Sequence, residues 1–279
     1  MKPAPFAYVR PSTLSEALTA LGEDPDAKVL AGGQSLLPLL SMRLAAPSRL
    51  VDINGLPDLD HVTCTPEGVR VGALARHSAV LASAEAAASQ PLLKMALEHV
   101  AHATIRNRGT TVGSVVHADP ASELPAVLML LGGSVDVEGP SGRRTIAADE
   151  LYVGPLETSM RRDEIAVEAF FPALVPSAGV AFEEIARRHG DYAMAGLAAH
   201  VVLDGDRVVS ARAGFFSVCD QPTVVDLTGA DDPGAAAMAH LDPAADIHAT
   251  ADYRAHLVRV LTPRVLAAAT EHARGRAHG

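Results

Sequence analysis

The stretch Val29-Leu30-Ala31-Gly32-Gly33-Gln34-Ser35-Leu36-Leu37-Pro38 carries the signal on which the fold assignment depends. A short apolar strand ends abruptly at two glycines, which let the backbone turn sharply and bring its amides close to a ligand. Consecutive amides of this kind bind anions, and Gln34 and Ser35 add side-chain donors. The loop therefore suits a phosphate or pyrophosphate, although an ordinary tight turn between a strand and a helix explains the same pattern.

The residues around this loop predict a small unit of alternating strands and helices. Strands are expected at residues 6–10, 28–31 and 49–53. Thr13 and Glu16 form a capping-box pattern, and Gly22 follows at the point where a helix would end. A strand, a helix and two further strands in this order indicate a βαβ unit.

The rest of the chain predicts two further units. Strands are expected at residues 69–74, 134–138 and 165–171, and helices at 91–101 and 123–131. Pro172, Pro176 and Gly179 mark a boundary. Beyond it, Asp204-Gly205-Asp206 predicts a hairpin, and residues 251–273 predict a helix. The predicted class is α+β, or mixed α/β, in three pieces at residues 1–55, 56–173 and 174–279.

A second polar, glycine-containing loop lies between the two central helices. It runs from Arg106-Asn107-Arg108-Gly109-Thr110 to His117-Ala118-Asp119-Pro120 and Glu123. Long polar segments inside compact domains are more often functional than idle, and the carboxylates here can accept hydrogen bonds from sugar or ribityl hydroxyls. The same residues also fit a plain helix start after Asp119-Pro120.

Composition excludes several classes of function. The chain of 279 residues has a net charge of −10, which argues against nucleic-acid binding. Its 2 cysteines cannot form a disulfide framework or hold an iron–sulfur cluster unaided. The sequence has no Gly-x-Gly fingerprint, no Gly-Lys pair for a P-loop and no complete Gly-x-Ser-x-Gly elbow. We expect neither a metal site nor a catalytic residue on this chain.

The apolar runs are too short to suggest a membrane protein. Residues 124–131 and 193–203 fall short of the roughly 20 residues that a spanning helix needs. The first ten residues lack the pattern of a secretion signal. We therefore expect no membrane insertion and a cytoplasmic location.

Together the two loops resemble the flavin motifs of the FAD-binding medium subunits of the molybdenum hydroxylases, a family that includes carbon monoxide dehydrogenase and xanthine dehydrogenase. The first motif matches residues 31–38, and the second matches residues 106–125. Further matches, in the family's order, are Gly72-Ala73-Leu74, Asp163-Glu164-Ile165, residues 187–193, Tyr253-Arg254 and Leu261-Thr262. The resemblance therefore covers essentially the whole chain.

The resemblance implies a two-subdomain FAD-binding fold of the vanillyl-alcohol-oxidase type, followed by a C-terminal domain with an antiparallel sheet and helix. It implies FAD on this chain, with the pyrophosphate on the first loop. The first-loop residues are Val29, Leu30, Ala31, Gly32, Gly33, Gln34, Ser35 and Leu36. The residues expected at the ribityl and adenosine parts are Thr110, Gly113, Ser114, His117, Asp119 and Glu123. Those expected beside the flavin ring are Ile165, Asp191 and Tyr192, although Tyr192 taken alone fits a half-buried core aromatic.

The family also implies partner chains. A large subunit carries the molybdopterin cofactor and selects the substrate, and a small subunit carries two [2Fe-2S] clusters. Electrons then pass through FAD on the medium subunit to an external acceptor. The low cysteine count agrees with clusters held elsewhere. We expect a dimer of heterotrimers, in which this flavoprotein oxidoreductase subunit does not turn over substrate by itself.

Two departures from the family pattern keep alternatives open. Val112 replaces the first glycine of a Gly-Gly pair, and a β-branched residue there would strain a positive φ and bring a side chain toward the ligand. Gln34 stands where many relatives have His, a milder change because both side chains donate hydrogen bonds. A self-contained FAD oxidoreductase is one alternative, and a flavin-free scaffold subunit is another.

Overall fold

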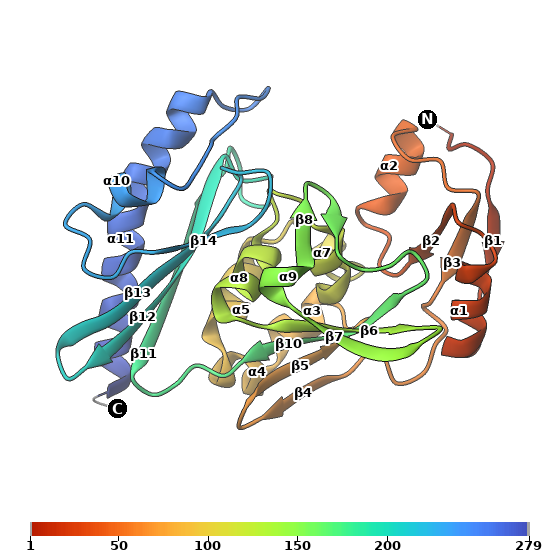
Figure 1. Cartoon of the computed structure of the whole chain (residues 1–279), viewed down its shortest axis with the longest axis horizontal. Helices are drawn as coiled ribbons and strands as arrows, with labels where there is room; N and C mark the ends of the chain where they lie inside the picture. The colour runs from red at the N-terminus through yellow and green to blue at the C-terminus, as the bar shows by residue number, and fades with distance from the viewer. Residues whose placement is uncertain (1, 278–279) are drawn as a thin grey trace.

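The computed structural model describes residues 2–277, and their strands form a parallel sheet, two larger antiparallel sheets and a small hairpin (Figure 1). The N-terminal elements are β1 (Ala7–Val9), α1 (Leu14–Gly22), β2 (Ala27–Leu30), α2 (Leu36–Met42) and β3 (Arg49–Asp52). The strands lie parallel in the order β1-β3-β2, as a βαβ unit requires. The hydroxyl of Thr13 accepts from the amide of Glu16, while the carboxylate of Glu16 accepts from the amide of Ser12 instead of that of Thr13.

The central region is an antiparallel sheet with helices packed on one face. Its elements are β4 (Val62–Thr65), β5 (Gly68–Gly72), α3 (His77–Ala82), α4 (Ala84–Ser89), α5 (Pro91–His99), α6 (Ala103–Arg106), α7 (Thr111–His117), α8 (Glu123–Leu131), β6 (Ser134–Gly139), β7 (Gly142–Ala147), α9 (Ala148–Leu151), β8 (Tyr152–Gly154), β9 (Glu157–Thr158) and β10 (Ile165–Pro172). The strand order is β4-β5-β10-β6-β7. Leu97 of α5, Leu128 of α8 and Phe171 of β10 are fully buried in the core between the helices and this sheet.

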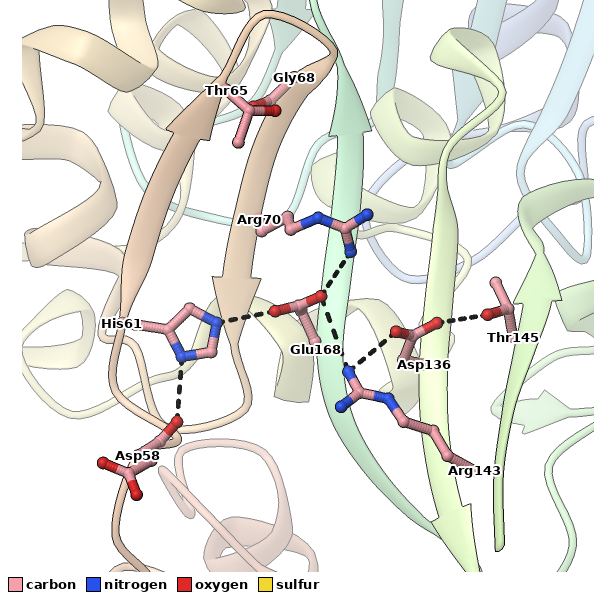
Figure 2. A network of polar contacts seen from close by, with 9 residues as sticks. All are labelled: Asp58, His61, Thr65, Gly68, Arg70, Asp136, Arg143, Thr145 and Glu168. Carbon is pink, nitrogen blue, oxygen red and sulfur yellow. Dashed lines mark hydrogen bonds and ion pairs between the residues drawn. The ribbon is translucent and has the colours of Figure 1, made fainter.

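The other face of this sheet carries a polar network (Figure 2). The carboxylate of Glu168 accepts hydrogen bonds from Arg70 at 2.7 Å and pairs with His61 at 2.8 Å. Arg143 lies 2.9 Å from Asp136 and 3.7 Å from Glu168. These side chains follow the alternation of strands whose second face is solvated, while Ile165 and Val167 of β10 pack against the N-terminal region.

The C-terminal region is an antiparallel sheet covered by a long helix. Its elements are β11 (Ala178–Ile185), β12 (Ala195–Asp204), β13 (Arg207–Phe216), β14 (Thr223–Asp226), α10 (Pro233–Met238) and α11 (Ala251–Ala277). The predicted hairpin joins β12 to β13, with Gly205 at φ +59°. Helix α11 packs along one face, and α8 contacts the sheet from the side of the central region (Figure 1). Among residues 2–277, no helix is long and apolar enough to cross a bilayer.

Candidate functional site

The two glycine-containing loops touch each other through their backbones. A Cβ atom at Gly32 would lie 2.5 Å from the carbonyl oxygen of Arg108, 2.8 Å from the Cα of Gly109 and 3.0 Å from the amide nitrogen of Thr110. No side chain fits at this distance, so residue 32 must be glycine for the loops to meet. The fold therefore brings together two segments that the sequence analysis selected separately.

The first loop presents unused backbone donors. Gly33 has φ +73°, and the side-chain amide of Gln34 donates to the carbonyl of Gly32 at 3.0 Å. Within residues 2–277, the amides of Gly32, Gly33, Gln34 and Ser35 donate to no protein acceptor. Successive amides left free in one turn suit an anionic group. The Gln34 side chain stabilises its own loop, and its contact with a ligand stays a prediction.

A polar network that the sequence did not reveal joins the two loops. Asn54 donates through its side-chain amide to the carbonyl of Ala31 at 2.7 Å. The guanidinium of Arg76 donates to the side-chain oxygen of Asn54 at 2.7 Å and to the carbonyl of Arg108 at 2.6 Å. Asp52 accepts from Asn54 and from the hydroxyl of Tyr8. Because Asn54 and Arg76 bind backbone carbonyls far away in the sequence, no local motif signals these two residues.

Thr110 forms the start of α7. Its hydroxyl accepts from the amide of Gly113 at 3.2 Å, and a Cβ at Gly113 would lie 2.5 Å from that oxygen. His77 holds the same turn, because its amide donates to the carbonyl of Gly109 and its ring lies 3.2 Å from the Thr111 hydroxyl. Burial lowers the pKa of His77 to about 4, and the charge of Arg106 adds to this effect. The imidazole is therefore neutral at physiological pH.

The expectation for Val112 is wrong. Residue 112 lies in the first turn of α7, with a negative φ, and only 1 % of its surface is exposed. Its side chain packs in the central core with Val115 and does not reach the loop surface. A β-branched residue is acceptable here because the helix directs its side chain into the core, and the strain argument therefore does not apply.

The remaining second-loop residues follow α7. Ala118 has φ +54°, and Asp119 accepts from the amide of Ala121 at 2.9 Å. The hydroxyl of Ser114 lies 2.9 Å from that of Ser122. Burial lowers the pKa of His117, which favours the neutral imidazole at the end of the helix. Ser114 thus has a protein partner for its hydroxyl, and its contact with the ribityl or adenosine part of FAD stays a prediction.

Glu123 and Tyr192 meet where the central and C-terminal regions join. Burial raises the pKa of Glu123 to about 8, and the negative charges of Glu184 and Asp119 raise it further. The pKa of Tyr192 is raised to about 12 by desolvation and by the carboxylates of Asp119 and Glu123, which places its hydroxyl near these groups. The Tyr192 side chain as a whole is 62 % exposed, so a core role is excluded and its ring is free to contact a ligand.

Ile165 lies in an apolar cluster beside the first loop, because Val29 and Ala31 pack against the same cluster. It is only 1 % exposed and packs in an apolar cluster with Ala17, Val51 and Leu74. Asp191 precedes Tyr192 in the same loop, and its amide closes a turn onto the carbonyl of Arg188 at 3.0 Å. The loop thus presents Asp191 and Tyr192 together, while contact of Ile165 with a flavin stays a prediction.

A cavity of about 530 Å³ lies elsewhere, between α1 and the turn from β6 to β7. Its lining includes Leu14, Leu18, Glu138 and Pro140, and none of the predicted FAD residues. In the part of the chain that the structure describes, no group of three or more His, Cys, Asp or Glu side chains could hold a metal ion. The loop pair, with its free amides and close backbones, is thus the better candidate site.

Comparisons with known proteins find relatives along nearly the whole chain. Residues 4–174 match the family model described as the FAD binding domain in molybdopterin dehydrogenase. Over 98 % of its length the chain is 40 % identical to the alpha subunit of the 6-hydroxypseudooxynicotine dehydrogenase complex of Paenarthrobacter nicotinovorans, covering 97 % of that protein. It is 36 % identical to the nicotine 6-hydroxylase medium subunit of the same organism, covering 95 % of this chain and 98 % of that one. Among solved structures, a chain of the CO dehydrogenase from Oligotropha carboxidovorans superposes with a TM-score of 0.92 at 31 % identity, covering 98 % of this chain and 100 % of that chain.

Proposed function

Because the chain belongs to the family of FAD-binding domains of molybdopterin dehydrogenases, we propose that it carries the FAD through which a heteromeric molybdenum hydroxylase passes electrons to an external acceptor. Membership makes it a medium subunit of the molybdenum hydroxylase type, which works with other subunits. The electron route, the acceptor and the exact partners are parts of the proposal.

The observation that carries this proposal is the contact of Gly32 with Gly109 and Thr110. It places the free amides of residues 32–35 beside the start of α7. Such a donor set fits the two negative charges of a pyrophosphate, because each amide contributes a hydrogen bond.

The chain's own residues would orient the cofactor. The first loop would hold the pyrophosphate, with Val29, Leu30 and Leu36 as apolar neighbours. Asp119 and Glu123 would face the ribityl and adenosine parts, and Tyr192 would pack on the flavin ring. When bound, FAD supplies the redox chemistry, since its ring can exchange one or two electrons.

The partner assignments rest on family membership. We propose a small subunit with [2Fe-2S] clusters and a large subunit with the molybdopterin cofactor, assembled as a dimer of heterotrimers. The relatives are named for a nicotine derivative, for nicotine and for CO, so similar medium subunits serve different substrates. The large subunit would therefore select the substrate.

Titration of the purified, FAD-free chain with FAD tests the cofactor assignment. The wild-type chain should bind one FAD and turn yellow, and Gly32→Ala should lose FAD because its new methyl group pushes the loops apart. Gly22→Ala is the matched control, since a Cβ at Gly22 would meet no atom within 4 Å. A colourless wild-type chain, or a Gly32→Ala chain that binds FAD normally, contradicts the proposal.

Purification of the chain from its native cells tests the partner assignment. We expect two further subunits to copurify, together with molybdenum and iron. Rapid reduction of the bound flavin by an organic substrate, with this chain alone, would instead indicate a self-contained oxidoreductase.

A further inference from the structure

Arg254, in the first turn of α11, is a buried cation held by three acceptors. Only 5 % of the residue is exposed. One guanidinium nitrogen donates to the carbonyls of Met194 and Ser217, the latter at 2.7 Å, and another donates to the carboxylate of Asp246 at 2.6 Å. A buried charge with this many partners is strongly ordered, and it orders the groups that it binds.

The two carbonyls belong to the ends of adjacent strands. The pairing of β12 with β13 ends at Gly196 and Phe216, and Met194 and Ser217 lie just beyond that pair. Arg254 therefore continues the connection between the two chain segments where the sheet ladder stops. It fixes the distance between the loop that enters β12 and the loop that leaves β13.

Both segments lead directly to the candidate flavin site. Met194 closes the loop of residues 186–193, because its amide donates to the carbonyl of Ile185 at 2.7 Å, and Tyr192 lies two residues before it. Ser217 has φ +64°, and its amide donates to the carbonyl of Pro120 at 2.8 Å. Pro120 follows Asp119, one of the carboxylates near the Tyr192 hydroxyl.

We propose that Arg254 is a positioning residue for the flavin ring, which holds the Tyr192 loop and the Asp119-Pro120 segment in one fixed arrangement from the C-terminal region. The proposal rests on the proposed function, because it assigns Tyr192 to the ring of a bound FAD. Arg254 acts through the carbonyls of Met194 and Ser217, to which its guanidinium donates.

FAD binding to the purified chain tests this role through a double-mutant cycle. In Arg254→Met the stem remains but the donors are lost, and we expect about tenfold weaker binding of FAD. Bound-flavin fluorescence should rise, because a displaced Tyr192 ring no longer quenches it. Arg254→Lys keeps the charge but lacks the planar guanidinium, so its FAD affinity should lie between those of the wild-type chain and Arg254→Met. Arg264→Met is the control, since Arg264 lies on the same helix and forms an exposed ion pair with Glu183.

Tyr192→Ala completes the cycle. If Arg254 acts through Tyr192, the effect of Arg254→Lys on FAD affinity and fluorescence should largely disappear in the Tyr192→Ala background. Suppose that the wild-type chain binds FAD. The positioning role alone is then overturned if the effects of the Arg254 and Tyr192 substitutions are additive, or if folded Arg254 variants show unchanged flavin fluorescence. A wild-type chain that binds no FAD overturns this role together with the proposed function.

Discussion

The two sides of the candidate site are built on different principles. On the N-terminal side, the loops of Gly32 and Gly109 meet backbone to backbone, and Arg76 links them through Asn54 and a carbonyl. On the C-terminal side, the exposed Tyr192 lies near the carboxylates of Asp119 and Glu123, and Arg254 binds the carbonyls of Met194 and Ser217. The first arrangement suits a charged group that needs many donors, and the second suits a flat ring that needs a packing surface.

The two sides also differ in the protonation that each requires. The N-terminal side contains a neutral, buried His77, and the C-terminal side contains a buried Glu123 that favours its protonated form. Acid therefore destabilises one side and alkali the other.

The Glu123→Gln substitution should remove an alkaline loss of stability. Folded Glu123 keeps its proton up to about pH 8, whereas the unfolded group loses it near 4.5, so stability falls as the pH rises between these values. The total is on the order of 5 kcal/mol, at about 1.4 kcal/mol per pKa unit. Urea unfolding of the FAD-free chain from pH 5 to 8 measures the slope, which Glu123→Gln should flatten. The exposed Glu150→Gln should leave it unchanged.

The His77→Asn substitution should remove an acid loss of stability. Unfolded His77 binds a proton below about 6.5, while the folded ring resists protonation until about pH 4, so stability falls as the pH falls between these values. The effect is on the order of 3 kcal/mol. Urea unfolding extended to pH 4 measures this loss of stability, and His240→Asn, at an exposed position, is the control. An unchanged acid limb in His77→Asn would mean that another group causes it.

The Arg76→Met substitution should weaken FAD binding by about tenfold, because Asn54 and the Arg108 carbonyl lose a charged donor and the loops separate. Arg70→Met is the matched control, since Arg70 pairs with Glu168 on the polar face of the central sheet (Figure 2). FAD titration compares the two. Equal losses in both variants would show that the effect is not specific to the loop pair.

The Asp246→Asn substitution should have the smallest effect. Desolvation opposes its ionisation, but the amides of His248 and Ala249 and the charge of Arg254 lower the pKa of Asp246 to about 2. The ionised carboxylate of Asp246 therefore stabilises the fold above the pKa of the unfolded group, and this stabilisation is lost as the pH falls toward 2. Because the side chain is 45 % exposed, water screens the pair, and we expect a loss below about 1 kcal/mol at pH 7. Thermal unfolding at pH 7 and pH 3 should show this loss at pH 7 and a smaller one at pH 3.

The elements whose signals are local could be predicted from the sequence. The βαβ order, the cap at Thr13, the hairpin at Gly205 and the helix that starts at Glu123 all depend on neighbouring residues. Helix α7 was missed inside the polar segment because Thr111, Gly113 and Ser114 are weak helix formers. Its stability comes from burying Val112 and Val115, a tertiary effect that propensity does not contain.

The site residues also divide into those with a local sequence signal and those that only the fold brings together. Gly32 and Gly33 are recognisable in the sequence because a tight turn needs them. The stronger requirement for glycine at residue 32 comes from the backbone of Arg108 and Gly109, which belongs to a distant segment. Asn54, Arg76 and His77 have no motif, since each acts on a carbonyl or hydroxyl that only the fold supplies. Arg254 belonged to a matched motif, yet its role follows only from Met194 and Ser217.

The contact between Gly32 and Gly109 has a consequence for the order of folding. It joins segments of the N-terminal and central regions that lie far apart in the sequence, and a contact of this kind forms only against a loop-closure entropy. FAD would then bind the complete chain and not its partly folded forms, and would stabilise it by mass action. A cell short of flavin would therefore hold more of this chain in open forms that proteases can cleave.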